Sequence, residues 1–328
     1  MSASRLELAL EEGLVHLPEG RVVVFGAVHP ADFAALDPGQ TTVVQRDRPA
    51  HDRMADAGFE VCVDPPAAAD GALVFLPRSK AEARATLEAA RALSDGPVIV
   101  DGQKTDGVES LYRDLRKRAE VTPALSKAHG KLFAFTSMTP FADWADPGDL
   151  TPAPGFVTRV GVFSADAIDR GSAVLAAALP RQMPKRVADL GAGWGYLSAM
   201  ALTRAGVEAI DLVEADHRAL DCAKRNVDDP RARFHWADAT TFAPEDTYDA
   251  VIMNPPFHTG SATTPSLGVA FIEAAARLLR PAGQLWLVAN RHLPYERTLA
   301  AHFREVHELG DDASFKIYHA RRPMWRPG

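Results

Sequence analysis

Short apolar runs alternate with alanine-rich, amphipathic segments along the second half of this chain. The runs are RVADL, AIDLVEA, RFHWAD, YDAVIMN and GQLWLVAN, and the segments between them include YLSAMALTRAG, DHRALDCAKRNV and GVAFIEAAARLLR. Strands that alternate with helices predict a mainly parallel sheet covered by helices on both faces. Two later apolar runs, FREVHELG and SFKIYHARR, are joined by the turn GDDA. We therefore expect a hairpin to close one edge of this sheet.

The first half of the chain repeats the same alternation more weakly. Its apolar runs are VVVFGA, TTVVQ, FEVCV, ALVFL, PVIVD and KLFAFTS. One order of elements (strand, proline turn, alanine-rich helix, Gly/Pro break, strand) occurs both in ALVFLPRSKAEARATLEAARALSDGPVIVDGQ and from AVIMNPPFHTG through FIEAAARLLRPAGQLWLVANR. We interpret the halves as a duplication of one α/β domain. The alternative is a pair of unrelated α/β domains of similar composition.

A stretch rich in proline and glycine separates the halves. It reads ADPGDLTPAPGF, from Ala145 to Phe156, and we expect no regular structure in it. The sequence thus predicts a first domain over residues 1–145, a linker over 146–160 and a second domain over 161–328.

Composition and charge restrict the functional classes. The 328 residues are 47% hydrophobic and 24% charged, as in ordinary globular proteins. The two cysteines, Cys62 and Cys222, lie far apart with no histidine pair at metal-ligand spacing, so neither a disulfide framework nor a metal site is expected. No apolar run is long enough to cross a bilayer, and we expect a soluble cytoplasmic protein with no membrane partner.

Charge alone does not favour a general nucleic-acid binder. The formal net charge is -7, whereas contacts to phosphates need a positive surface. A local basic patch is still compatible with this balance, and one segment, SLYRDLRKRAE, concentrates Arg113, Arg116, Lys117 and Arg118. Such a run is also typical of a solvated helix face.

A glycine-rich turn follows the first strand of the second half. RVADLGAGWGYLS places Asp189 at the end of the strand, then Gly191, Gly193 and Gly195, and then a helix. Glycines let the backbone turn sharply and approach a ligand, and the helix N-terminus presents free N–H groups. A nicotinamide dinucleotide site would also use such a turn. The spacing G-x-G-x-G, with Trp194 inside it, matches the dinucleotide spacing G-x-G-x-x-G poorly.

Acidic residues follow the next two strands. Glu214 ends the second strand, where a carboxylate can accept hydrogen bonds from both hydroxyls of a ribose, and Asp238 follows the third strand, where one can accept from an adenine amino group. Each could instead be the N-cap of the helix after it. Their succession at carboxyl ends of strands favours a ligand site, because open sheets bind ligands at that edge.

The fourth strand ends in VIMNPPFHTG. Pro255 and Pro256 cannot continue a central strand, so the backbone leaves the sheet directly after Asn254. The side-chain oxygen of Asn254 and the carbonyl of Pro255 can both accept hydrogen bonds from an amine on a planar base, and Phe257 can stack on that base. This arrangement suits transfer of a group to the amine. In the first half, Leu76 and Ser79 take the places of Asn254 and Phe257.

Several of these motifs together resemble a known family. DLGAGWG, VEAD, ADAT and NPPF resemble successive motifs of class I S-adenosylmethionine-dependent methyltransferases. With GVFSADAIDRGSAVL, VANRHLPYE and FKIYHARR, the chain is similar to the ribosomal RNA small-subunit methyltransferase C family, which methylates guanine N2 in 16S rRNA. The resemblance implies two tandem Rossmann-like α/β domains, of which the first is degenerate and the second has a seven-stranded, mainly parallel sheet with a C-terminal hairpin.

The resemblance also implies a role for each matching residue. Asp189 and the three glycines would surround the methionine part of S-adenosylmethionine, Glu214 would bind its ribose, and Asp238 with Ala239 would face its adenine. Phe163 and Ser164 would close over the cofactor. The catalytic residues would be Asn254, which also lies against the cofactor, with Pro255 and Phe257. Beyond what the resemblance implies, we expect Phe257 and His258 to contact the substrate, although a lone histidine after a turn is more often a structural hydrogen-bonder, and the first domain to bind RNA with Arg113, Arg116, Lys117 and Arg118 as candidate phosphate contacts.

Other functions remain open at this point. The enzyme alternatives are transfer to guanine N2 in 23S rRNA, to adenine N6 or to a protein glutamine, and a nicotinamide-dependent dehydrogenase. The non-enzyme alternative is an RNA-binding ribosome assembly factor with a vestigial site. We expect a monomer that acts on rRNA within or near the small ribosomal subunit and needs no metal.

Overall fold

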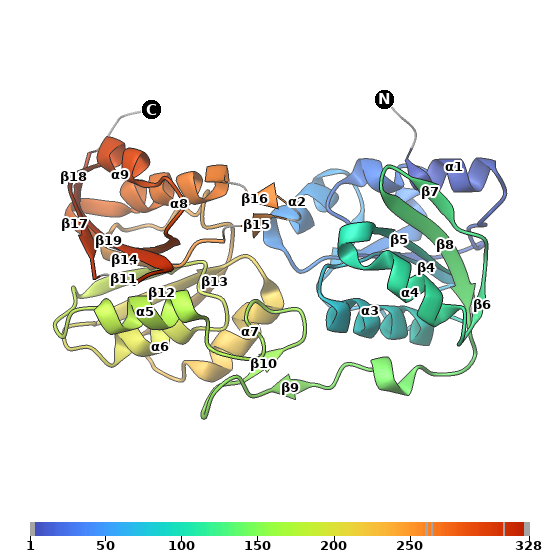
Figure 1. Cartoon of the computed structure of the whole chain (residues 1–328), viewed down its shortest axis with the longest axis horizontal. Helices are drawn as coiled ribbons and strands as arrows, with labels where there is room; N and C mark the ends of the chain where they lie inside the picture. Colours follow the sequence, from blue (N-terminus) through green and yellow to red (C-terminus); the bar gives the residue numbers. More distant parts are fainter. Residues whose placement is uncertain (1–3, 257, 260–261, 264, 311, 325–328) are drawn as a thin grey trace. The chain divides into compact units, whose positions relative to one another are not determined.

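The computed structural model describes residues 4–256, 258–259, 262–263, 265–310 and 312–324. The chain divides into two compact units, Met1–Gly148 and Asp149–Gly328 (Figure 1). Cys62 and Cys222 are both free thiols. In the described ranges, no helix is long and apolar enough to cross a membrane.

The C-terminal unit is built on a seven-stranded sheet in the order β13-β12-β11-β14-β17-β19-β18. All neighbouring pairs from β13 to β17 are parallel, whereas β19 is antiparallel to both β17 and β18. The predicted parallel sheet with a C-terminal hairpin is confirmed. The strands are β11 (Arg186–Leu190), β12 (Ala209–Glu214), β13 (Ala232–Trp236), β14 (Tyr248–Met253), β17 (Leu279–Asn290), β18 (Phe303–Leu309) and β19 (Phe315–Pro323).

Helices cover both faces of this sheet, as the apolar runs predict. One face packs against α5 (Arg170–Ala178), α6 (Tyr196–Leu202) and α7 (His217–Asn226), and the other against α8 (Pro265–Leu278) and α9 (Glu296–His302) (Figure 1). The central strands contribute buried residues to both cores, which is why they read as continuous apolar runs. Beyond β14, the chain forms a short pair of strands, β15 (His258–Thr259) and β16 (Ala262–Thr263).

The N-terminal unit repeats this topology. Its sheet has the path β3-β2-β1-β4-β5-β8-β6, with β7 also paired to β8, and all pairs from β3 to β5 are parallel. All six predicted strands are present: β1 (Val22–Phe25), β2 (Thr41–Val44), β3 (Glu60–Cys62), β4 (Gly71–Phe75), β5 (Val98–Gln103) and β8 (Gly130–Thr136). The short strands β6 (Glu120–Val121) and β7 (Leu125–Lys127) were not predicted.

The helices of this unit also lie on both faces of its sheet. The core on one face includes α3 (Lys80–Leu93) and α4 (Val108–Leu115), and that on the other includes α1 (Arg5–Glu11) and α2 (Arg48–Asp56). The shared strand order supports our interpretation of the halves as a duplication.

The stretch between the predicted domains corrects one expectation. Asp149–Leu150 forms β9, which pairs with β10 (Thr158–Arg159), so regular structure does occur within residues 145–156. An ion pair explains why: Arg225 on α7 binds Asp149 with both guanidinium nitrogens, at 2.9 and 2.5 Å. This contact, which no local pattern reveals, fixes β9 on the C-terminal unit.

Candidate functional site

The glycine turn connects β11 to α6 through three left-handed residues. Gly191, Gly193 and Gly195 have φ angles of 72°, 55° and 90°, which L side chains adopt only with strain. A Cβ at Gly195 would lie 2.9 Å from Cγ2 of Val227, whereas one at Gly193 would meet no atom within 4 Å. Gly195 therefore allows the turn to pack on the region around α7, and Gly193 leaves open space above the turn.

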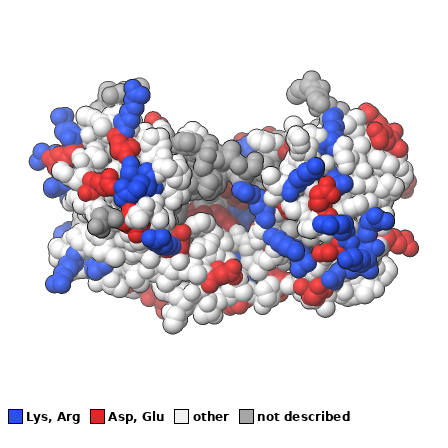
Figure 2. Space-filling model, in the orientation of Figure 1, with Lys and Arg blue, Asp and Glu red and all other residues white. Residues whose placement is uncertain are grey.

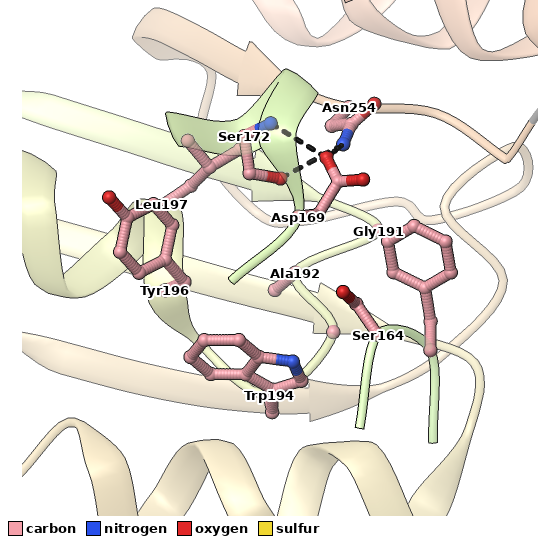
Figure 3. Close-up of a pocket in the computed structure, with 11 residues that line it drawn as sticks. Ser164, Asp169, Ser172, Gly191, Ala192, Trp194, Tyr196, Leu197 and Asn254 are labelled. Atoms are coloured by element: carbon pink, nitrogen blue, oxygen red, sulfur yellow. Dashed lines mark hydrogen bonds between the residues drawn. The ribbon is translucent and has the colours of Figure 1, made fainter. Parts of the chain in front are cut away.

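A pocket opens beside this turn. In Figure 3 the turn forms one side, and Asp169, Ser172 and Asn254 converge on it from α5 and the end of β14. Phe163 lines the pocket although its side chain is 66% exposed, and the next residue, Ser164, has a φ of 52°. The lining residues are Phe163, Ser164, Asp169, Ser172, Gly191, Ala192, Gly193, Trp194, Tyr196, Leu197 and Asn254.

Glu214 is fixed at the end of β12 by two backbone N–H groups. Gly193 donates to its Oε2 at 2.7 Å and Asp216 donates to its Oε1 at 2.8 Å. Burial nevertheless raises the pKa of Glu214 to about 7. The carboxylate thus supports the glycine turn while its remaining lone pairs stay available to hydroxyl donors.

Asp189 is completely buried at the end of β11. The Ser198 hydroxyl of α6 donates to Oδ2 at 2.7 Å, and Oδ1 has no hydrogen-bond partner in the part of the chain that the structure describes. Burial raises the pKa of Asp189 from 3.8 to about 7. A buried acceptor without a donor is costly, so this oxygen favours a site that a ligand completes.

Asp189 should make stability depend on pH. Between pH 4 and 7 the folded Asp189 is largely protonated and the unfolded one is ionised, so the unfolded state binds fewer protons and stability falls as pH rises. We expect this residue to lower the free energy of unfolding by about 1–3 kcal/mol from pH 5 to 8. In Asp189→Asn, urea denaturation should show a correspondingly smaller decrease. Equal decreases in both proteins would contradict the raised pKa.

The side-chain amide nitrogen of Asn254, the residue after β14, is hydrogen-bonded to two acceptors. Nδ2 donates to Asp169 Oδ2 at 2.8 Å and to Ser172 Oγ at 2.9 Å (Figure 3). Because both N–H bonds are used, the amide is oriented with Oδ1 as its outward acceptor, and no donor reaches Oδ1 from the described residues. Pro255, directly after it, is buried.

The structure brings together five of the residues that the sequence singles out. Phe163, Ser164, Gly191, Gly193 and Asn254 all line the pocket. The other candidates in this unit lie at the same sheet edge without lining the pocket: Asp189, Gly195, Glu214, Asp238, Ala239 and Pro255. Phe257 lies outside the described residues, and so does the side chain of His258.

The two acidic residues differ in their local roles. Asp216, and not Glu214, is the N-cap of α7, so the capping alternative for Glu214 is wrong. Asp238 accepts from the backbone N–H and the hydroxyl of Thr240, at 2.8 and 2.7 Å, so it does stabilise the turn after β13.

Six lining residues were missed by sequence reasoning: Asp169, Ser172, Ala192, Trp194, Tyr196 and Leu197. Asp169 and Ser172 carried a local signal, because an Asp before RGSAVLAAA is a typical N-cap, and Asp169 indeed accepts from Ser172 N at 2.7 Å. Trp194 and Tyr196 pack against each other and against Phe156, with ring centroids 5.3–5.9 Å apart. These ring contacts stabilise the glycine turn.

The basic candidates lie in the N-terminal unit. Figure 2 shows Lys and Arg side chains gathered on the face of this unit that carries α3 and α4. Arg113, Arg116 and Lys117 are exposed around the end of α4. Arg118 differs, because both of its terminal nitrogens bind Asp143, at 2.6 and 2.8 Å, and its guanidinium lies 5.0 Å from the Trp144 ring. Its internal contacts weaken the prediction that Arg118 binds phosphate.

The part of the chain that the structure describes has no candidate metal site. Among the residues that the structure describes, no group of three or more His, Cys, Asp or Glu side chains is placed to hold a metal ion.

Comparisons with known proteins agree with this geometry. Residues 154–319 match the family described as Methyltransferase small domain. A protein from Shewanella pealeana named ribosomal RNA small subunit methyltransferase C is 32% identical over 262 residues, 76% of this chain and 76% of its own length. A protein of the same name from Hahella chejuensis is 32% identical over 234 residues, 67% of this chain and 68% of its own.

A solved structure extends the similarity of fold to both units. The 16S rRNA N2 methyltransferase of T. thermophilus, solved in complex with AdoMet and guanosine, superimposes with a TM-score of 0.77 at 24% identity and covers 94% of this chain and 90% of its own. Two tandem methyltransferase-like α/β units are therefore the fold of this chain. On the sequence matches, the chain belongs to the ribosomal RNA small subunit methyltransferase C family.

Proposed function

We propose that the C-terminal unit transfers a methyl group from S-adenosylmethionine to the exocyclic N2 of a guanine in 16S rRNA. The observation that carries this proposal is the orientation of Asn254: both N–H bonds of its amide are held, so its oxygen faces the target as an acceptor. The relatives named ribosomal RNA small subunit methyltransferase C support the choice of rRNA, and the T. thermophilus structure is of a 16S rRNA N2 methyltransferase.

The pocket, together with Asp189 and Glu214 at the same sheet edge, fits the cofactor. Asp189 offers a buried oxygen without a donor, Gly193 leaves open space above the turn, and Glu214 presents a carboxylate anchored by backbone N–H groups. We assign the methionine part to the glycine turn and Asp189, and the ribose to Glu214. The adenine is assigned to Asp238 and Ala239, and the outer cover of the pocket to Phe163 and Ser164.

The chain would act mainly by positioning. When bound, S-adenosylmethionine supplies a methyl group activated by its sulfonium. The N2 of guanine is a poor nucleophile because its lone pair is delocalised into the ring. Asn254 Oδ1 would accept one N2–H and the Pro255 carbonyl the other, which turns the lone pair toward the methyl carbon. N2 becomes acidic as its bond to carbon forms, so the proton can pass to water without a strong base.

The target base must also leave its stack. Guanine N2 faces a partner in paired RNA, so the base has to be extruded or already unpaired before it reaches Asn254. We assign Phe257 to stacking on this base and His258 to a contact with the substrate. We propose that the protein acts on rRNA in the cytoplasm, as a monomer.

The direct test uses labelled cofactor. Incubation with 16S or 23S rRNA, free and within ribosomal particles, followed by mapping of the labelled base, should place the label on guanine N2 of 16S rRNA. Label on 23S rRNA, on adenine N6 or on protein would contradict the assignment. A protein that binds rRNA but transfers no label would be an assembly factor. Stabilisation in thermal melts by NAD, and not by S-adenosylhomocysteine, would contradict the cofactor.

The N-terminal unit is assigned to RNA binding through Arg113, Arg116 and Lys117. Replacing all three by alanine should weaken rRNA binding and reduce the slope of log affinity against log salt by about 2–3, because each phosphate contact releases about one counterion. Cofactor affinity should not change. The matched control, Arg118→Ala, removes a cation of the same segment that is already paired with Asp143. Its salt slope should stay close to that of the wild type, and equal slopes in all three proteins would refute the assignment.

A further inference from the structure

The N-terminus of α5 contacts Asn254 through a cluster formed by the side chains of Asp169, Ser172 and Asn254. The proposed mechanism assigns no role to Asp169 or Ser172. Asp169 Oδ2 accepts two hydrogen bonds, from Ser172 N at 2.7 Å and from Asn254 Nδ2 at 2.8 Å. Ser172, a residue that is 9% exposed, accepts the second N–H of Asn254 through its Oγ at 2.9 Å. One carboxylate thus caps the helix and holds the amide, 85 residues away in sequence.

Without such partners, the side-chain amide of an asparagine has no fixed choice of which end, oxygen or nitrogen, faces the site. The two ends of the amide have nearly the same shape, so a flip would exchange an acceptor for a donor at the same place. A donor there would face the N–H groups of an amine and repel them. The Asp169 carboxylate opposes this flip because it can only accept, whereas the Ser172 hydroxyl accepts the second N–H in the observed orientation.

Contacts of α5 with Phe315 and Asp312 also hold this cluster in place. A Cβ at Gly171 would lie 3.1 Å from Asp169 Oδ2 and 3.1 Å from the Phe315 ring, so a larger residue there would push the carboxylate or the ring away by a few tenths of an ångström. Arg170 lies over Phe315, 5.6 Å from its ring centroid, and pairs with Asp312 at 3.0 Å. These contacts hold Asp169 on the sheet and thereby fix the direction of its carboxylate.

We propose that Asp169 and Ser172 are positioning residues, which select the rotamer of Asn254 that aims its oxygen at the target amine. The proposal rests on the proposed function of Asn254 as an acceptor for that amine. Neither residue exchanges a proton or forms a bond in the reaction. Their effect should therefore appear in kcat rather than in the KM for the cofactor.

The test separates helix capping from positioning. Asp169→Ser keeps a good N-cap for α5, but its side chain is one atom shorter and does not reach Asn254. We expect kcat for rRNA methylation to fall about 10- to 100-fold, with cofactor KM changed less than threefold. Ser172→Ala should lower kcat less, and Ser172→Thr, which keeps the hydroxyl, should retain more activity than alanine. The matched control is Asp47→Ser, the same change at the N-cap of α2 in the N-terminal unit, which should leave kcat unaltered.

Three kinetic outcomes would overturn the proposal. Unchanged kcat in Asp169→Ser would show that the residue is only a cap. A raised cofactor KM with unchanged kcat would show that its carboxylate binds the cofactor instead. A pair of substitutions separates positioning from misfolding. Asn254→Asp places two carboxylates face to face, and adding Asp169→Asn should raise the activity of that variant at least tenfold. No restoration would also count against the proposal.

A readout that does not depend on activity distinguishes this inference from the proposed function. In ¹⁵N-labelled protein, the side-chain amide of Asn254, assigned by its absence in Asn254→Ala, should exchange its protons with water faster in Asp169→Ser than in the wild type. Faster exchange in a chain whose wild type methylates no guanine would support the cluster and refute the function. Equal exchange rates in the two proteins would refute the cluster.

Discussion

Replacing Asn254 by alanine should lower kcat for methyl transfer by about 10²–10³-fold. The loss is expected to be this large because the amide oxygen is an oriented acceptor in a partly buried site, and removal of one such preorganised group typically costs this much. Radioactive methyl transfer to 16S rRNA under single-turnover conditions would measure it. Full activity in Asn254→Ala would refute the mechanism.

The binding steps provide the control for this variant. RNA affinity should be unchanged in Asn254→Ala, and cofactor affinity should change less than tenfold, because the glycine turn and Glu214 are untouched. Calorimetric titration with S-adenosylhomocysteine checks the second point. If binding were lost together with activity, Asn254 would be a structural residue of the pocket and not an acceptor for the amine.

The N-terminal unit has the same fold without an asparagine in the place of Asn254. It has the same strand order, and its β4 ends at Phe75 as β14 ends at Met253. The next residue is Leu76, 7% exposed and part of the core, in the place of Asn254. The unit retains one left-handed glycine after β1, Gly26, with a φ of 71°. Its fold is kept by apolar burial, which does not require the polar residues of a catalytic site.

The sheet topology could be predicted because its determinants are local. Buried parallel strands read as apolar runs, and their alternation with helices fixes the architecture. The pairing of β9 with β10 could not be predicted, because each strand has two residues and depends on the contact between Asp149 and Arg225. Strand pairs of this size have no pattern of their own.

The site could be predicted only where each residue follows a strand. Asp189, Glu214 and Asn254 stand at strand ends, so their positions follow from the order of strands. Asp169 stands at the start of a helix, where an ordinary N-cap already explains it. Its second role, toward Asn254, arises from packing between segments 85 residues apart, and this is visible only in the folded chain.

Glu214 should couple cofactor binding to pH. Burial raises its pKa to about 7, so the carboxyl is largely neutral at pH 6 and largely ionised at pH 8. The ionised form accepts hydroxyl hydrogen bonds more strongly, and its charge attracts a cationic sulfonium. We therefore expect the affinity for S-adenosylmethionine to rise about tenfold from pH 6 to 8, as measured by calorimetry.

Substitution of Glu214 should both weaken binding and remove part of this pH dependence. Glu214→Gln loses the charge, and its amide nitrogen would face the N–H of Gly193 or Asp216, so affinity at pH 8 should fall about 10- to 100-fold. Asp189 has a similarly raised pKa and should account for the dependence that remains. The double variant with Asp189→Asn should bind equally at pH 6 and 8. A wild type that binds equally at both pH values would refute the assignment of Glu214 to the ribose in its ionised form, since binding would then change the protonation of neither carboxylate.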